Sequence, residues 1–164
     1  MATVEKSIEI DLPLSTVYNQ WTQFEDFPHF MEGVEQVKQL NDTNLRWVAE
    51  IAGQRRKWEA EITEQKPDER IAWRSREGAE NAGVVTFHRI DDNKTKVMLQ
   101  LDFEPEGIVE QVGDKLGIVS IRTDADLKRF KKFIEARGSE TGAWRGEVGR
   151  PDEVKLPAEE RTQI

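Results

Sequence analysis

Hydrophobic and polar residues alternate along most of the chain before residue 104. In residues 4–12 the apolar side chains fall on one side and the charged or hydroxyl side chains on the other, which is typical of a half-buried strand. After Pro13, residues 14–24 place large apolar side chains at helical spacing and predict a short helix. The aromatic segment that follows, closed by Gly33, predicts a second short helix packed on the first.

Residues 34–103 show the pattern of short strands separated by turns. Glycine, proline, aspartate and asparagine mark turns at residues 53–54, 67–69 and 91–94. Each segment between these turns has one apolar and one charged face. We therefore expect an antiparallel meander that contacts water on one side only.

Residues 107–137 predict one long helix, which would reach roughly 45 Å if it were straight. Its apolar stripe repeats at steps of three and four residues and has one polar member, Thr123. The other members are Val109, Val112, Leu116, Val119, Leu127, Phe130 and Ile134. Glycines in its first half leave open a break with a restart at Thr123, and Gly138 is a natural C-terminal cap. Residues 139–164 lack apolar periodicity. We expect a domain over residues 1–138 and a flexible C-terminal tail over residues 139–164, pinned locally by Trp144.

The order of these elements predicts an α+β fold, because a run of strands is followed by a helix. We expect a curved antiparallel sheet of six or seven strands, wrapped around the long C-terminal helix, with two short helices after the first strand. A single helix cannot cover the apolar face of so wide a sheet. The sheet must curl around it, and a curled sheet leaves interior volume unless large side chains fill that volume.

Several segments together resemble a known superfamily: residues 17–21 (VYNQW) with 24–31 (FEDFPHFM), 70–75 (RIAWRS), 83–87 (GVVTF), 95–97 (TKV) and 126–135 (DLKRFKKFIE). The chain resembles the START-like superfamily, also called SRPBCC, helix-grip or Bet v 1-like, and most resembles its bacterial polyketide cyclase/dehydrase-type members. The resemblance implies an apolar cavity between sheet and helix, with the short helices near its mouth. It implies no single activity, because this fold includes lipid carriers, hormone receptors, cyclases and co-chaperones.

Composition narrows the function classes. The net charge is −8, and the one compact basic cluster, residues 55–57, has acidic neighbours, so we expect no nucleic-acid binding. The chain has no cysteine, which excludes disulfides and thiolate chemistry. Its N-terminus lacks the apolar core of a signal peptide, and no apolar run approaches the roughly 20 residues of a membrane span. We therefore expect a cytoplasmic protein.

Large apolar side chains are the candidates for the cavity wall. Trp47, Trp58 and Trp73 share one predicted face, where they either fill the core or line a cavity and stack on a flat ligand. Arg56 and Ser75 lie on the same faces and are candidate polar groups, although an unpartnered buried arginine is costly, so we expect Arg56 at a strand end. The full candidate set is Phe27, Phe30, Trp47, Arg56, Trp58, Trp73, Ser75, Phe87, Leu99, Leu101, Val112 and Leu116.

The short aromatic helix allows two interpretations: Phe24, Phe27, Phe30 and Met31 form a lid over the cavity, or they seat the short helices on the sheet. Catalytic candidates are few. His29 and His88 do not form a pair, and alternation places His88 outward if Phe87 points inward. No phosphate loop, zinc-protease motif or serine-hydrolase motif occurs, so we expect no cofactor and no metal.

Three functions remain open. The first is a carrier or sensor that binds an apolar small molecule, such as a lipid, an isoprenoid or an aromatic polyketide. The second, suggested by the resemblance, is a polyketide cyclase or dehydratase in which Arg56 and Ser75 orient carbonyl groups and His29 or a water moves protons. The third is a stress or chaperone-type interaction module, which a completely filled interior would favour. In each case we expect a monomer or a weak homodimer.

Overall fold

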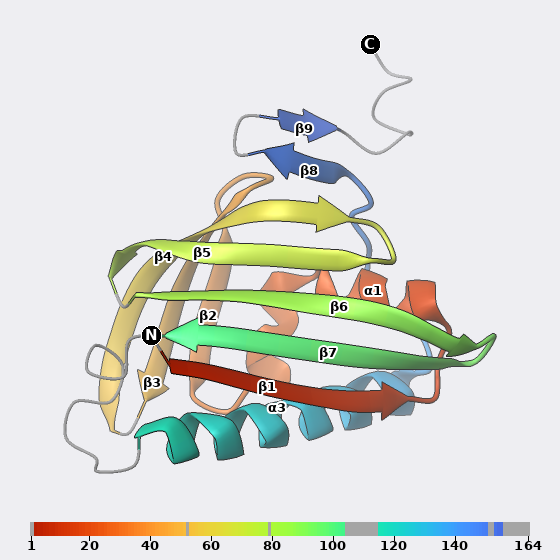
Figure 1. The fold of residues 1–164 in the computed structure, drawn as a ribbon, viewed down its shortest axis with the longest axis horizontal. Coiled ribbons are helices and arrows are strands. Elements are labelled where there is room, and N and C mark those ends of the chain that lie inside the picture. Colours follow the sequence, from red (N-terminus) through yellow and green to blue (C-terminus); the bar gives the residue numbers. More distant parts are fainter. Residues whose placement is uncertain (1, 52, 79, 104–114, 151–152, 156–164) are drawn as a thin grey trace.

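The computed structural model describes residues 2–51, 53–78, 80–103, 115–150 and 153–155 (Figure 1). In chain order the elements are β1 (Ala2–Ile10), α1 (Leu14–Trp21), the 3-10 helix η1 (Phe24–His29), β2 (Val34–Gln39), β3 (Asn44–Ile51), β4 (Gln54–Lys66), β5 (Arg70–Gly78), β6 (Asn81–Asp91), β7 (Lys94–Phe103), α3 (Lys115–Arg137), β8 (Glu147–Arg150) and β9 (Glu153–Lys155).

The sheet is the antiparallel meander that the sequence predicts. Its strands follow the order β1-β7-β6-β5-β4-β3-β2, so that β1 and β2 form its two edges. Figure 1 shows the sheet bending away from a flat plane, with the β2–β4 side turned behind β5–β7. Register shifts within β4 accompany this bend, as bulges do in strongly curved sheets. The expected α+β helix-grip fold is confirmed.

Helix α3 closes the half-barrel by bonding to both of its edges. On the β1 side, Lys131 Nζ donates to the Glu9 carbonyl (2.8 Å) and the Asp11 amide donates to Glu135 Oε2 (2.8 Å). On the β2–β3 side, Arg122 Nη2 donates to the carbonyl of Glu50 (2.9 Å). An edge strand presents unpaired backbone groups, and these side chains satisfy several of them.

The inner face of α3 carries the predicted stripe. Thr123, Leu127, Phe130 and Ile134 are all buried, at the spacing of one helical face. The possible break at Thr123 does not occur: its hydroxyl donates to the Val119 carbonyl one turn earlier (2.7 Å), and the helix continues to Arg137. The amide of Gly138 then caps the helix on the Ile134 carbonyl, as expected. Residues 107–114, where we expected the helix to begin, lie outside the described residues.

Aromatic rings hold α1 and η1 against α3 and the sheet. Trp21 makes edge-to-face contacts with Phe27 (5.5 Å between ring centroids) and Phe130 (5.0 Å). Phe30 packs on Phe130 at the same distance, and Phe24 is buried as well. These rings are part of the main core and seat the short helices on the sheet, while Phe24, Phe27 and Met31 of the same segment also line the cavity described below.

The C-terminal segment differs from the flexible tail that we expected from residue 139. The Thr141 amide donates to Gln20 Oε1 (2.9 Å), the Trp144 amide donates to Thr22 Oγ1 (3.1 Å), and Val148 is completely buried where β8 pairs with β4. Sequence patterning missed this because an irregular segment that docks through backbone bonds and isolated side chains has no period. Residues 139–150 therefore pack on the domain.

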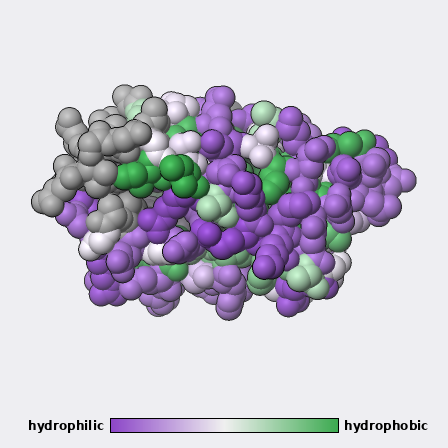
Figure 2. Space-filling view, turned by 90° about the horizontal axis from the view of Figure 1, so that it is seen from below, coloured by the Kyte–Doolittle hydropathy of each residue, from purple (hydrophilic) through white to green (hydrophobic). Residues whose placement is uncertain are grey.

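The outer surface is largely polar. Figure 2, which views the face that carries α3, is mostly hydrophilic with small hydrophobic areas. Ile121, on α3, is the most exposed large apolar residue among those described, at 72%. No helix in the described part of the chain is both long and apolar enough to cross a membrane.

Candidate functional site

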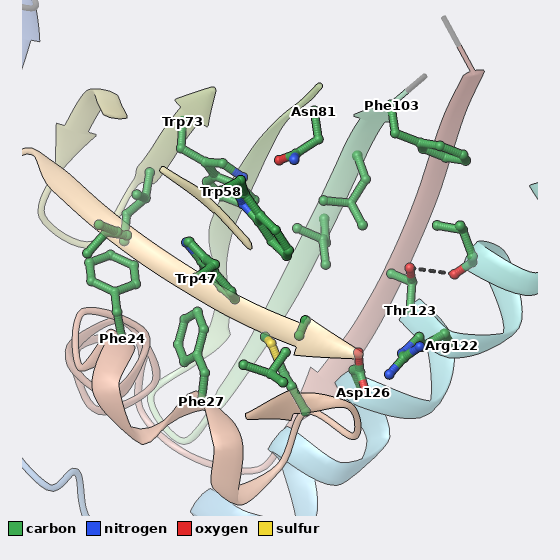
Figure 3. A pocket seen from close by; sticks show the side chains of 18 of the residues that line it. Phe24, Phe27, Trp47, Trp58, Trp73, Asn81, Phe103, Arg122, Thr123 and Asp126 are labelled. Carbon is green, nitrogen blue, oxygen red and sulfur yellow. Dashed lines mark hydrogen bonds between the residues drawn. The ribbon is translucent and has the colours of Figure 1, made fainter. Parts of the chain in front are cut away.

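A cavity of about 200 Å³ lies between the concave face of the sheet, η1 and α3 (Figure 3). Its wall receives residues from the strands β2 to β7, from both short helices and from α3. An engineered apolar cavity of about 150 Å³ in a protein core takes up benzene. The interior is therefore not completely filled, and the space suits a molecule of one or two rings.

Three tryptophans form the sheet side of the cavity. Trp47 and Trp58 are direct partners across β3 and β4, and their rings stack with centroids 5.6 Å apart and planes inclined by 7°. Trp73 lies across Gly83 on the neighbouring strand, where an added Cβ would come within 2.5 Å of the indole. Gly83 thus provides the space in which the Trp73 ring lies flat along the sheet.

The rest of the wall is almost entirely apolar. Its floor and sides are formed by aliphatic and aromatic side chains, among them Trp21, Phe24, Phe27, Leu45, Ala49, Ile62, Ile71, Leu99, Leu101, Phe103, Val119 and Leu127. The indole Nε1 of Trp47 is buried and has no hydrogen-bond partner among the described residues. A buried donor without a partner is costly, and this one belongs to a residue of the cavity wall.

Polar residues of the wall are concentrated on α3. Figure 3 shows Arg122, Thr123 and Asp126 on this helix, facing the tryptophans across the cavity. The Thr123 hydroxyl is engaged within the helix. Asn81 and Asp102 complete the polar set, and Asp102 accepts a hydrogen bond from Thr3 Oγ1 (2.7 Å).

The guanidinium of Arg122 is held by backbone carbonyls. Nη2 donates to Glu32 O (2.5 Å) and Glu50 O (2.9 Å), and Nε donates to Glu32 O (3.2 Å). The guanidinium occupies the space beside Gly33, where an added Cβ would fall 1.5 Å from Nη2. Gly33 also has a φ of 85°, so both its backbone and this close approach require glycine.

Asp126 is engaged differently. Its Oδ1 accepts from Arg129 Nη2 (2.5 Å) and from the Glu32 amide (3.3 Å). Burial raises the pKa of Asp126, against the opposing effect of the hydrogen bond from Arg129. The wall therefore contains a carboxylate paired with Arg129 and, one helical turn earlier, the carbonyl-bound Arg122.

Half of the predicted site residues lie on the cavity wall: Phe27, Trp47, Trp58, Trp73, Leu99 and Leu101. Phe30 and Phe87 are buried in the core instead, Phe30 against Phe130 and Phe87 against Tyr18 (5.3 Å between centroids). Val112 lies outside the described residues, and so does the side chain of Leu116.

The two predicted polar groups do not reach the wall. Arg56 lies near the start of β4, and its Nη2 donates to Gln54 Oε1 (2.7 Å). Ser75 Oγ accepts from the Asn81 amide (3.0 Å) and so supports a wall residue without being one. His29 stacks on Phe133 (6.0 Å between centroids), and His88 points outward as alternation predicts. Arg56, Ser75 and His29, the side chains considered for a cyclase, therefore do not meet at the cavity wall.

Sequence reasoning missed Arg122 and Asp126. A signal for them does exist, because both positions fall next to the apolar stripe of α3, between Val119 and Leu127. Polar residues that flank the apolar stripe of a helix over a cavity are candidates for ligand contacts. No cluster of histidine, aspartate or glutamate suited to a metal ion occurs in the described ranges.

Known proteins resemble this chain in sequence and in fold. The family described as polyketide cyclase / dehydrase and lipid transport matches residues 10–132. The chain belongs to this family. The resemblance to SRPBCC-type proteins found in the sequence is thus confirmed.

One relative in sequence and two solved structures are similar to this chain. An uncharacterised 17.2 kDa protein of Streptomyces lincolnensis is 60% identical over 149 residues, covering 90% of this chain and 99% of that protein. The Zhui aromatase/cyclase of Streptomyces sp. R1128 has a similar structure, with a TM-score of 0.71, 20% identity, and coverage of 87% of this chain and 98% of that chain. A START superfamily protein of Mycobacterium smegmatis matches with a TM-score of 0.65, 17% identity, and coverage of 82% and 95%. At these identities the two structures support the fold alone.

Proposed function

We propose that this member of the family binds an apolar, ring-containing small molecule in the cavity between the sheet and α3, as a carrier or sensor. The observation that carries the proposal is the unfilled space lined by Trp47, Trp58 and Trp73. Large aromatic side chains usually pack together and exclude space. Here two of them stack on one another and the third lies over Gly83, and all three border a space that they do not fill.

The wall favours binding over chemistry. Among the described residues, no nucleophile with an adjacent base faces the cavity, and the histidines lie elsewhere. A polyketide cyclase or dehydratase acting in the same cavity is the second candidate. It would need a proton donor in the wall, and Asp126 fits that role by its position and its raised pKa. The third function, an interaction module, was tied to a filled interior, so the cavity does not support it.

The test is a titration with N-phenyl-1-naphthylamine, a neutral probe that fluoresces in apolar surroundings. We expect saturable binding with micromolar affinity, together with quenching of tryptophan emission by energy transfer to the bound probe. Replacing Ala49, which is buried on the wall, by leucine puts a larger side chain into the cavity. Ala49→Leu should weaken probe binding at least about tenfold.

Ala72→Leu is the matched control. Ala72 lies between the wall residues Ile71 and Trp73 on β5, so it points to the other face of the sheet. This variant should bind the probe like the unmodified protein. Probe uptake that does not saturate, or equal affinity in Ala49→Leu and the unmodified chain, would refute binding in the cavity.

A further inference from the structure

We propose that the ligand carries one anionic oxygen group, such as a carboxylate, and that Arg122 binds it at the α3 end of the cavity. This inference rests on the proposed function and names the chemical class of its ligand: a small aromatic acid whose ring lies against the tryptophans. The juxtaposition that carries it is an arginine on one side of a largely apolar cavity and stacked indoles on the other (Figure 3).

Arg122 has hydrogen-bonding capacity to spare. A guanidinium has five N–H donors, and the described partners of Arg122, Glu32 O and Glu50 O, bind Nε and Nη2 only. Within the part of the chain that the structure describes, Nη1 donates to no residue. Its two N–H groups can therefore donate to an oxygen of a ligand.

Arg122 also has no direct ion-pair partner among the described residues, although its charge acts on Asp126 at longer range. No carboxylate of the described residues lies within 4.0 Å of its nitrogens, whereas Asp126 is paired with Arg129. Glu32, the other carboxylate near Arg129, has a side chain that is 78% exposed, so water screens it. Arg129 thus pairs with Asp126 and Glu32, whereas Arg122 is the cation of this group that has no carboxylate partner among the described residues.

The guanidinium is held in place before any ligand arrives. Two backbone carbonyls fix its orientation, and the absence of a side chain at Gly33 provides the space it occupies. A group fixed in this way loses little conformational entropy on binding, which increases affinity and selectivity. A lysine would supply the charge without this fixed planar geometry.

The experiment displaces bound N-phenyl-1-naphthylamine with two naphthalenes of the same shape: 2-naphthoate, which is anionic at neutral pH, and neutral 2-naphthalenemethanol. We expect the unmodified protein to bind 2-naphthoate about tenfold more tightly than the alcohol. Arg122→Gln should abolish this preference by weakening 2-naphthoate alone, with affinity for the alcohol unchanged within about twofold. Arg122→Lys should keep part of the preference for 2-naphthoate. It replaces Arg122→Gln as the test variant if Arg122→Gln does not fold.

Lys128→Gln is the matched control, because it removes one positive charge from the exposed side of the same helix, where Lys128 pairs with Asp124. It should leave the preference intact. Equal affinity of the unmodified protein for the two naphthalenes, or equal weakening of both by Arg122→Gln, overturns the anion site while ligand binding stands. Displacement by neither compound also overturns the anion site alone, whereas failure of the probe itself to bind removes the proposed function and this inference together.

Discussion

At the scale of single residues, Gly83 shows how one position determines the shape of the cavity. The Trp73 ring lies where a side chain at residue 83 would project, and the Gln100 carbonyl borders the same space at 3.1 Å from the position of an added Cβ. The backbone cannot move away without disturbing the pairing of β6 with β7. An added methyl group must therefore displace the indole toward the cavity.

We expect Gly83→Ala to lower the free energy of unfolding by about 1–3 kcal/mol, through overpacking, and to weaken binding of N-phenyl-1-naphthylamine. Urea denaturation and probe titration measure the two effects. Trp73→Phe provides the control: the smaller ring should reduce the cost of Gly83→Ala, so that the two substitutions are not additive. The same cost in both backgrounds would show that Trp73 is not the group displaced.

At the scale of elements, the stretch from Ser139 to Arg150 behaves as a strap across α1 and β4. The Arg145 guanidinium lies over the Tyr18 ring (5.5 Å from its centroid), donates to Asn19 Oδ1 (2.6 Å) and pairs with Asp68 (2.7 Å). Val148 follows as a completely buried residue of the main core. None of the described residues of this strap lies on the cavity wall, so its contribution is to stability.

Val148→Ala should lower the free energy of unfolding by about 2 kcal/mol, because it removes buried methyl groups and leaves a void. Leu40, which is 39% exposed, supplies the comparison, and Leu40→Ala should cost no more than about 0.5 kcal/mol. Chemical denaturation monitored by tryptophan emission distinguishes the two. Equal costs would mean that the strap is not docked in solution.

At the scale of the whole molecule, one buried polar network joins distant parts of the chain. Tyr18 on α1 accepts a hydrogen bond from Gln65 on β4 (3.1 Å), while Arg145 of the strap lies over its ring. Tyr18 is completely buried, and this burial raises its pKa to about 12, an effect that the hydrogen bond from Gln65 and the charge of Arg145 oppose. The network ties the N-terminal, central and C-terminal parts together.

The raised pKa limits stability at alkaline pH. Below about pH 10 the phenol is protonated in both the folded and unfolded states; above it the unfolded state loses the proton first, so stability falls until the folded pKa is passed. We expect roughly 2–3 kcal/mol to be lost between about pH 10 and pH 12. Tyr18 is the only tyrosine, so ultraviolet absorbance reports its ionisation directly. Tyr18→Phe should lack this component, and a phenol that titrates near pH 10 in the folded protein would contradict the argument.

The sequence by itself determined the order and type of the elements from β1 to α3. Alternation along β1–β7 and the stripe from Thr123 to Ile134 have clear periods, because one face of each element must be buried. The same periods placed Trp47, Trp58 and Trp73 on one face, and the width of the sheet relative to one helix predicted an interior space. These features follow from the local geometry of strands and helices, which produces a regular spacing of hydrophobic residues in the sequence.

Tertiary structure decided everything that depends on contacts between distant segments. Phe30 and Phe87 are buried, yet they fill the core, because Phe30 packs on Phe130 of α3 and Phe87 packs on Tyr18 of α1. Arg122 reaches the cavity only because Gly33 and the carbonyls of Glu32 and Glu50 meet α3 across the open seam of the half-barrel. The strap over α1 likewise depends on single hydrogen bonds to residues more than 100 positions earlier, and such bonds leave no period in the sequence.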